Sequence, residues 1–413
     1  MNKPFVLASL LLLLVLSLAA CSRAKPTPTP TSAPAATAKP AATATVAPTA
    51  TSAPTATRVP TPTTAPTATT APTPVPTPAP LTFNVKVGGE DLSQALTFET
   101  FLPSDLTVDV GDSITFTKKT AEPHSVTFNA QDTDPPPFLP RPDGKLEANP
   151  LLFPPSPAPS GPQPAPGASL NLSVKFDGTG YLNSGILNTT NDVFKVTFTK
   201  AGTYKYVCLL HAAHMNGTIT VSSAGTPYPK TAADYDKEEP AHLALHQTNA
   251  KALFDTLKVP TPATAADGSR TFTAFAAAGD NPTGNDFFRF IGGESLTVKA
   301  GDKITWTIEK NRPGVPHTIT LLALGVVRPD LVVPEPQPQG PPKLIVDPKV
   351  QAPAPQATAP YAGSGYFNSG LLVSGSPTPQ NFSLTFTTPG TYKYLCIVHD
   401  EAGMNGTITV QAR

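Results

Sequence analysis

One short pattern of potential metal ligands occurs twice along the 413 residues of this chain. Residues 202–221 and 390–410 read almost alike, and each places a thiol, an imidazole and a thioether within nine residues or fewer. These side chains are Cys208, His211 and Met215 in the first copy and Cys396, His399 and Met404 in the second. The only other sulfur residues are Met1 and Cys21. Ordinary core cysteines and methionines are the alternative interpretation, but it does not explain equal placement beside a histidine in both copies.

A second histidine precedes each cysteine at long range. His124 lies 84 residues before Cys208 and His317 lies 79 residues before Cys396, and both follow a proline and enter an apolar segment. Two imidazoles, a thiolate and a weak thioether suit a copper site that carries one electron, because the thiolate stabilises Cu(I) and imidazole accepts either oxidation state. The sequence therefore predicts two copper sites.

Three histidines remain outside these sets. His214, beside Met215, is a competing ligand in the first copy. His242 and His246 are spaced i, i+4 on a predicted helix and could bind a metal ion together, but the sequence near them offers no third ligand candidate. A solvated helix face is the favoured interpretation of that pair.

The segments around the ligands alternate apolar and polar residues, which is typical of half-buried strands. Residues 81–87 and 193–199 show this alternation, and residues 106–117 predict a strand, a Gly-Asp turn and a second strand. Residues 296–307 repeat the 106–117 pattern, at offsets near those of the ligand copies. This is a tandem duplication in which each copy is large enough for its own core. The expected domains are 81–222 and 270–413.

Proline-rich inserts and a connector separate these patterns. The inserts, about 132–167 and 333–360, lack periodicity and are interpreted as irregular loops. In the connector, 223–269, the residues 234–257 predict one amphipathic helix packed on or between the domains.

The N-terminal region predicts export. Residues 1–21 have a lysine, an apolar run too short for a comfortable membrane span, and Leu18-Ala19-Ala20-Cys21. This end resembles a bacterial lipobox, which implies cleavage before Cys21 and lipidation of its thiol; an ordinary secretory signal is the alternative. Residues 22–80 are nearly all Pro, Thr, Ala and Ser, and predict a disordered, extended tether.

Composition excludes some classes of partner. Lys plus Arg equals Asp plus Glu at 29 each, so no global field favours nucleic acid. If Cys208 and Cys396 are metal ligands and Cys21 is lipidated, no cysteine remains for a disulfide within a domain.

The strand–Gly-Asp–strand, Pro-His, Gly-Thr-Tyr-x-Tyr-x-Cys-x-x-His and Met-Asn-Gly-Thr-Ile-Thr-Val motifs together resemble the blue copper proteins (cupredoxins), especially plastocyanin and amicyanin. The resemblance implies an all-β fold with two Greek-key β-sandwiches and copper at one end of each. It implies these ligands: His124, Cys208, His211 and Met215, and His317, Cys396, His399 and Met404. The Cys-to-Met spacing of the second copy matches plastocyanin, whereas the first copy is one residue shorter. Tyr204 and Tyr392 resemble the structural corner tyrosine of such sandwiches.

These features favour an electron carrier tethered to the outer face of the cell membrane or in the periplasm, with redox proteins of a respiratory or photosynthetic chain as partners. Copper storage or delivery is the alternative. A copper oxidoreductase of the nitrite-reductase type, or a multicopper oxidase, needs a histidine next to the copper cysteine. Here the neighbours of the two cysteines are Val207, Leu209, Leu395 and Ile397, so both enzyme classes are disfavoured.

Overall fold

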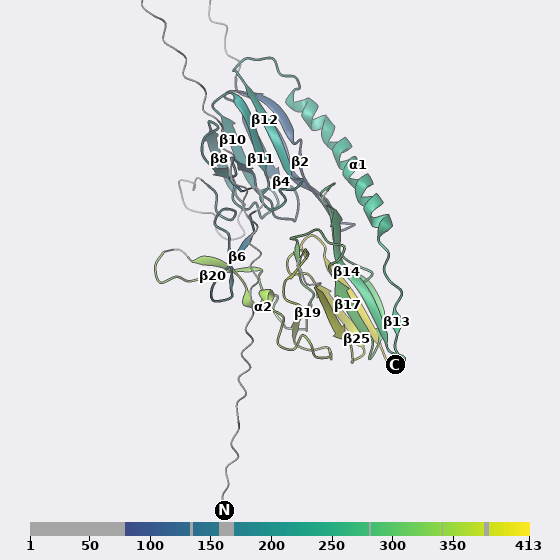
Figure 1. Ribbon diagram of the computed structural model, residues 1–413. Coiled ribbons are helices and arrows are strands. Elements are labelled where there is room, and N and C mark those ends of the chain that lie inside the picture. Colours follow the sequence, from purple (N-terminus) through teal and green to yellow (C-terminus); the bar gives the residue numbers. More distant parts are fainter. Residues whose placement is uncertain (1–78, 133–134, 157–168, 281, 341, 376–379) are drawn as a thin grey trace, which may run out of the picture. The chain divides into compact units, whose positions relative to one another are not determined.

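Two β-sandwiches follow one another in the computed structural model, which describes residues 79–413 except 133–134, 157–168, 281, 341 and 376–379 (Figure 1). The predicted signal segment 1–21 and nearly all of the tether 22–80 lie outside the described residues. The elements of the first half are β1 (Thr82–Asp91), β2 (Leu96–Leu102), β3 (Asp105–Asp109), β4 (Ser113–Lys118), β5 (Thr127–Phe128), β6 (Phe138–Pro140), β7 (Leu146–Ala148), β8 (Asn171–Phe176), β9 (Leu182–Asn183), β10 (Val193–Phe198), β11 (Gly202–Val207), β12 (Asn216–Ser222) and helix α1 (Ala232–Thr256).

The second half repeats this order with small changes. Its elements are β13 (Ala263–Thr264), β14 (Arg270–Asp280), β15 (Asn285–Ile291), β16 (Ser295–Lys299), β17 (Lys303–Thr307), β18 (Pro316–His317), β19 (Thr320–Leu322), β20 (Val332–Glu335), β21 (Lys343–Val346), α2 (Pro348–Gln351), β22 (Tyr366–Asn368), β23 (Leu372–Val373), β24 (Asn381–Thr385), β25 (Gly390–Leu395) and β26 (Asn405–Gln411). The expected all-β fold with two cupredoxin-type sandwiches is confirmed.

Each sandwich consists of two sheets. In the first domain the strand orders are β2-β1-β4-β10-β8 and β3-β12-β11-β5-β9; in the second they are β15-β14-β17-β24 and β16-β26-β25-β19-β22. The strand–turn–strand predicted over 106–117 forms β3 and β4, but these strands belong to different sheets. The turn is therefore a corner between sheets and not a hairpin. Gly111 occupies the left-handed region at φ +101°, and the Asp112 carboxylate accepts the Leu81 and Asp109 amides at 2.7 and 2.8 Å.

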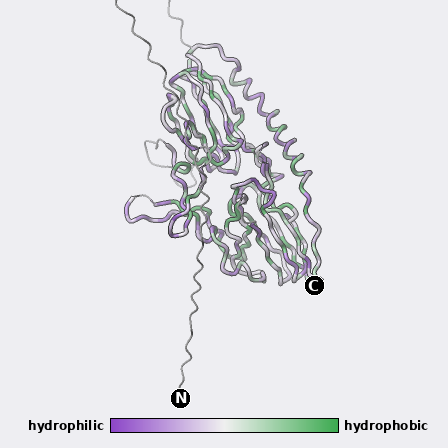
Figure 2. The backbone as a smooth tube through the Cα atoms, in the orientation of Figure 1, coloured by the Kyte–Doolittle hydropathy of each residue, from purple (hydrophilic) through white to green (hydrophobic). Residues whose placement is uncertain are grey.

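The cores are aromatic and lie between the sheets. Along β10, Phe194, Val196 and Phe198 alternate as buried residues, as the period-two pattern predicts. In the second domain Trp306 is fully buried and its indole N–H donates to the Tyr394 hydroxyl at 3.2 Å. Green, hydrophobic positions recur along the strands, whereas much of α1 is purple or white (Figure 2).

The predicted corner tyrosines make the expected backbone contacts. The Tyr204 hydroxyl donates to the Lys200 carbonyl and the Tyr392 hydroxyl to the Thr388 carbonyl, both at 2.9 Å. These bonds fasten the start of each cysteine-bearing strand to the turn before it.

Strand pairing and α1 join the two sandwiches. β15 pairs antiparallel with β2, so the first sheets of the two domains form one continuous sheet. Helix α1, close to the predicted range 234–257, begins at a capping box between Thr231 and Asp234. Its apolar residues Leu243, Ala250 and Phe254 pack with side chains of β2 and β15. Within the described residues, no helix combines the length and apolar character that a membrane crossing requires.

The proline-rich inserts are more ordered than the sequence analysis expected. Their described parts contain β6 and β7 from the first domain and β20 and β21 from the second, which form one four-stranded sheet through the β7–β21 pairing. Glu335 accepts from both Arg141 and Lys145, and Lys343 Nζ lies 2.9 Å from Glu147. The inserts therefore link the two domains.

Candidate metal centres

The three predicted donors of the first domain meet at one buried point. His124 precedes β5, Cys208 directly follows β11, and His211 lies in the turn between β11 and β12. The two histidine Nδ1 atoms are 3.1 Å apart, and Cys208 Sγ lies 3.9 Å from that of His124 and 3.6 Å from that of His211. Because β5 and β11 are paired in one sheet, residues 84 positions apart in sequence come together.

The second domain repeats this arrangement. Nδ1 of His317 and Nδ1 of His399 are 3.1 Å apart, and Cys396 Sγ lies 3.8 Å from each. All six donors are buried. Both copies of the motif form the same triangle, which indicates that the geometry follows from the sequence pattern that they share.

The triangles have the right size for a metal ion. A point equidistant from the three donor atoms lies about 2.1 Å from each in both domains, within the 2.0–2.3 Å that metal–nitrogen and metal–sulfur bonds to zinc require. Two imidazoles and one thiolate in a trigonal arrangement suit type 1 copper. The donors therefore fit the metal that their chemistry suggests.

Burial also sets the protonation of these donors. It lowers the pKa of His124 and of His317 to about 3, so both imidazoles are neutral at physiological pH. It raises the pKa of Cys208 and of Cys396 to about 11, so each thiol must give up its proton when a metal binds. In the first domain His124 Nε2 lies 3.1 Å from the Thr120 hydroxyl, which leaves Nδ1 facing the thiol.

The two cysteine-to-methionine loops close in the same way despite their different lengths. The Cys208 amide donates to the Met215 carbonyl at 2.9 Å, and the Cys396 amide to the Met404 carbonyl at 3.0 Å. Gly403, at φ +99°, absorbs the additional residue of the second loop. Both methionines are fully buried in the domain cores.

Two residues that the sequence analysis did not single out hold the cysteine sulfurs. The amides of Ser125 and Thr318 each lie 3.3 Å from the sulfur of their domain. Their hydroxyls accept the amides of Leu209 and Ile397, which directly follow the cysteines, at 2.9 and 2.8 Å. The detectable signal is a hydroxyl residue directly after the first histidine in both copies.

The Nε2 atoms of His211 and His399, which point away from the cysteines, both lie near Glu122. His211 Nε2 lies 3.3 Å from Glu99 Oε1 and 3.4 Å from Glu122 Oε1. The other oxygen of Glu122 lies 3.6 Å from His399 Nε2. The His399 ring also stacks on Phe288, with centroids 4.0 Å apart. One carboxylate from the first domain therefore contacts histidines of both domains.

A buried arginine neutralises the acidic groups beside this contact. Arg312 Nη2 lies 2.5 Å from Glu99 Oε2, and its Nε donates to both oxygens of Asp286 at 2.8 and 2.9 Å. Glu99, Glu122 and His211 also have oxygens and a nitrogen close enough for a metal ion. The guanidinium already supplies positive charge to Glu99, so we assign no ion there.

The remaining histidines do not join the donor triangles. His214 Nε2 lies 2.7 Å from Glu99 and 3.3 Å from Arg312 Nη1. It belongs to the charged cluster between the domains and not to the first-domain cysteine. On α1, His246 Nδ1 lies 2.9 Å from the Asn285 side chain, while His242 is exposed.

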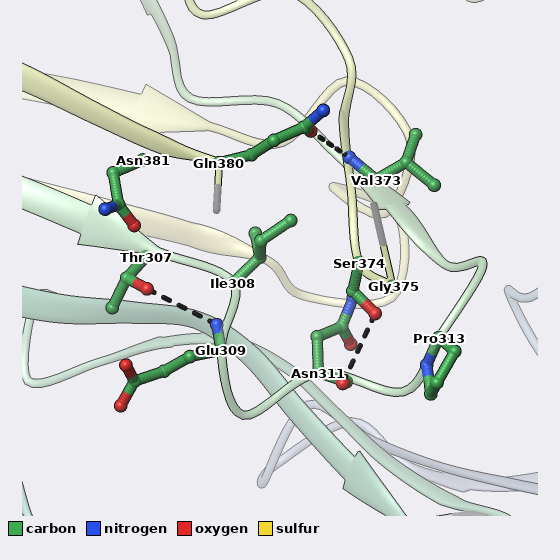
Figure 3. Close-up of a pocket in the computed structure, with 10 residues that line it drawn as sticks. All are labelled: Thr307, Ile308, Glu309, Asn311, Pro313, Val373, Ser374, Gly375, Gln380 and Asn381. Carbon is green, nitrogen blue, oxygen red and sulfur yellow. Dashed lines mark hydrogen bonds between the residues drawn. The ribbon is translucent and has the colours of Figure 1, made fainter. Parts of the chain in front are cut away.

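The pocket in Figure 3 is a separate feature. It has a volume of about 340 Å³ and lies in the second domain, between the chain at the end of β17 and the segment around β23. Its lining residues include Glu309 and Gln380 but no histidine or cysteine. It therefore offers no soft metal ligand.

Fold and donors together define a copper-binding cupredoxin, and sequence comparison agrees. Residues 84–222 and 355–411 match the family of copper-binding proteins of the plastocyanin/azurin type. The strands β14 to β19 complete the second domain before its matched segment. This chain is a tandem cupredoxin, and the His/Cys/His group of each domain fits a type 1 copper site.

Individual relatives cover one domain's length. Plastocyanin of Sambucus nigra is 29% identical over 139 residues, which are 33% of this chain and 98% of that protein. Chloroplastic plastocyanin of Physcomitrium patens is 27% identical over 139 residues, or 33% of this chain and 56% of that protein. A Cu(I) structure of an amicyanin mutant has 21% identity, covers 37% of this chain and 97% of its own, and has a TM-score of 0.20.

Proposed function

We propose that this chain is a membrane-tethered, extracytoplasmic electron carrier that holds one type 1 copper in each domain. The proposal rests on one observation: two imidazole nitrogens and one thiol sulfur form the same triangle in both domains. The ligands we assign are His124, Cys208, His211 and Met215 in the first domain and His317, Cys396, His399 and Met404 in the second. Bound copper would supply one-electron chemistry between Cu(II) and Cu(I).

The residues of the chain would make that chemistry fast by limiting rearrangement. The three donors of each domain lie within 3.9 Å of one another, and the Ser125 and Thr318 amides hold the sulfurs in place. Leu209 and Ile397, which are 3% and 2% exposed, exclude water beside the cysteines. Redox proteins of a respiratory or photosynthetic chain are the partners we propose.

Two other functions use the same donors. Copper storage or delivery needs a metal that leaves easily, which the complete burial of both cysteines disfavours. Catalysis of the nitrite-reductase type needs a histidine beside the copper cysteine, and Val207, Leu209, Leu395 and Ile397 occupy those positions.

Copper titration of the exported chain tests the assignment. We expect about two copper ions per chain and an intense blue colour that disappears on reduction, because thiolate-to-copper charge transfer produces it. Cys208→Ser and Cys396→Ser should each remove about half of the absorbance and one copper, and the double variant should be colourless. A Cys396→Ser chain with undiminished blue colour would exclude the second site. Copper that binds without colour would favour storage.

The proposed anchor has its own test. Cys21→Ser should move the chain from the membrane fraction to the soluble fraction, because the lipidated thiol would be lost. Intact-mass measurement of the membrane-bound wild-type chain should show the acyl groups. An unmodified Cys21 in that sample would contradict the anchor without affecting the copper assignment.

A further inference from the structure

Glu122 contacts one histidine of each domain. Its two carboxylate oxygens face His211 Nε2 at 3.4 Å and His399 Nε2 at 3.6 Å. Each of these rings points its other nitrogen, Nδ1, at the cysteine of its own domain. A continuous chain of groups therefore runs from one donor triangle, through two imidazoles and one carboxylate, to the other.

The same contact closes both rings to solvent. His211 is 7% exposed and His399 is 2% exposed, and Glu122 itself is 7% exposed. Glu99 covers His211 from a second side, and Phe288 stacks on His399. A redox partner in solution therefore has little access to the imidazole edges, whereas each ring has access to the other domain.

We infer that Glu122 connects the two copper centres into one electron-sharing unit, in which an electron passes between the domains through His211, Glu122 and His399. This inference rests on the proposed function. Copper held by the two His/Cys/His groups would supply the one-electron couple, so that one centre would be oxidised as the other is reduced, and His211, Glu122 and His399 would carry that single electron between them. No bond forms or breaks, and no proton or further reactant is needed.

The surrounding contacts hold this path in place. Glu122 lies in a loop that begins after β4, where the Thr120 hydroxyl donates to the Glu122 carbonyl at 3.0 Å. On the other side, Arg312 reaches from the second domain to Glu99 of the first. The β2–β15 pairing fixes the same boundary through the backbone. The path therefore lies in a region where both domains are fastened together.

The exchange can be measured on the copper-loaded full chain after a light pulse reduces a fraction of the sites. We expect a first-order phase whose rate does not depend on protein concentration, resolved with the reference spectra of Cys208→Ser and Cys396→Ser. Glu122→Ala should slow this phase at least about tenfold. Glu122→Gln keeps a bridging side chain of the same shape and should retain most of the rate. Asp177→Ala removes an exposed carboxylate of the same domain that accepts from the amide and hydroxyl of Thr179; it is the control and should leave the rate unchanged.

A measurement on the chain without metal distinguishes loss of the Glu122 contacts from a general disruption of the copper sites. Nitrogen NMR of the histidine rings in the metal-free chain should show that Glu122→Ala, a change in the first domain, shifts the His399 resonances as well as those of His211. An unchanged exchange rate in Glu122→Ala, with both sites blue, would overturn the inference. Two blue sites without any first-order phase in the wild-type chain would also overturn it and leave the carrier function intact. Colourless sites would overturn the proposed function itself.

Discussion

Arg312→Met should destabilise the chain by about 3–5 kcal/mol, because it leaves two buried carboxylates without their shared counter-ion. Arg312 is 5% exposed, and Glu99 and Asp286 are 1% and 0% exposed. Methionine can fill the space of the aliphatic stem but cannot donate to either carboxylate. Since Glu99 and Arg312 belong to different domains, the loss should also loosen the domain boundary. Urea unfolding monitored by tryptophan fluorescence measures the effect.

The controls for this experiment are available in the same chain. Arg270→Met removes a partly exposed ion pair with Asp302 and should cost at most about 1 kcal/mol. If Arg312→Met fails to fold, the triple variant with Glu99→Gln and Asp286→Asn should restore folding, because it removes the unpaired charges. Equal unfolding midpoints for the Arg312 and Arg270 variants would contradict the role given to Arg312.

The stability of Arg312→Met should depend on pH because of the buried Asp286 carboxylate. Burial raises the pKa of Asp286 well above its ordinary value, and Arg312 opposes that rise. Without Arg312 the folded-state pKa rises further, so the folded chain binds a proton more readily than the unfolded chain does. Stability then increases as pH falls through the folded-state pKa. The deficit of Arg312→Met should therefore shrink in mildly acidic buffer.

Lys118→Met should cost about 3 kcal/mol or more, because it removes a buried ammonium that serves three backbone carbonyls. Lys118 is 0% exposed, and its Nζ donates to the carbonyls of Thr120, Ala121 and Asn188 at 2.5, 3.3 and 2.9 Å. These bonds shape the loop that presents Thr120 to His124. We therefore expect a lower melting temperature and a perturbed colour in the first domain alone.

Lys119→Met is the matched control, since Lys119 is exposed and its ammonium donates to the Asn191 side chain, whereas its backbone bond to Val87 does not depend on the side chain. It should change stability by no more than about 0.5 kcal/mol. The position that corresponds to Lys118 in the second domain is Ile308, which is buried and apolar. Identical melting curves for the two lysine variants would show that the loop does not depend on the buried ammonium.

The donor triangles could be predicted from sequence because their information is local and repeated. Cys208 and His211, like Cys396 and His399, lie three residues apart in a turn between paired strands. The strands themselves follow from alternation, as β10 illustrates. His124 and His317 lie far from their cysteines in sequence, and assigning them as ligands required the assumption that both copies fold alike.

The domain boundary could not be predicted, because its residues show no pattern of their own. Glu122 and Arg312 are 190 positions apart, and either alone reads as an ordinary surface charge. β7 and β21 are three and four residues long, too short for a period to be detected, and their pairing joins segments that are far apart in sequence. Ser125 and Thr318 follow the first histidine of each copy, but a single hydroxyl residue at that position does not by itself indicate a bond to the cysteine sulfur.

The antiparallel pairing of β2 with β15 has a consequence for how the two domains associate. In a separate domain, each of these strands would be an exposed edge strand that could pair with another chain and cause aggregation. Two identical subunits can form a symmetric dimer by pairing such edge strands. Here α1 and its flanking residues join the partners covalently, so each half meets the other at a high effective concentration. Dilution, which dissociates a dimer, leaves this association intact.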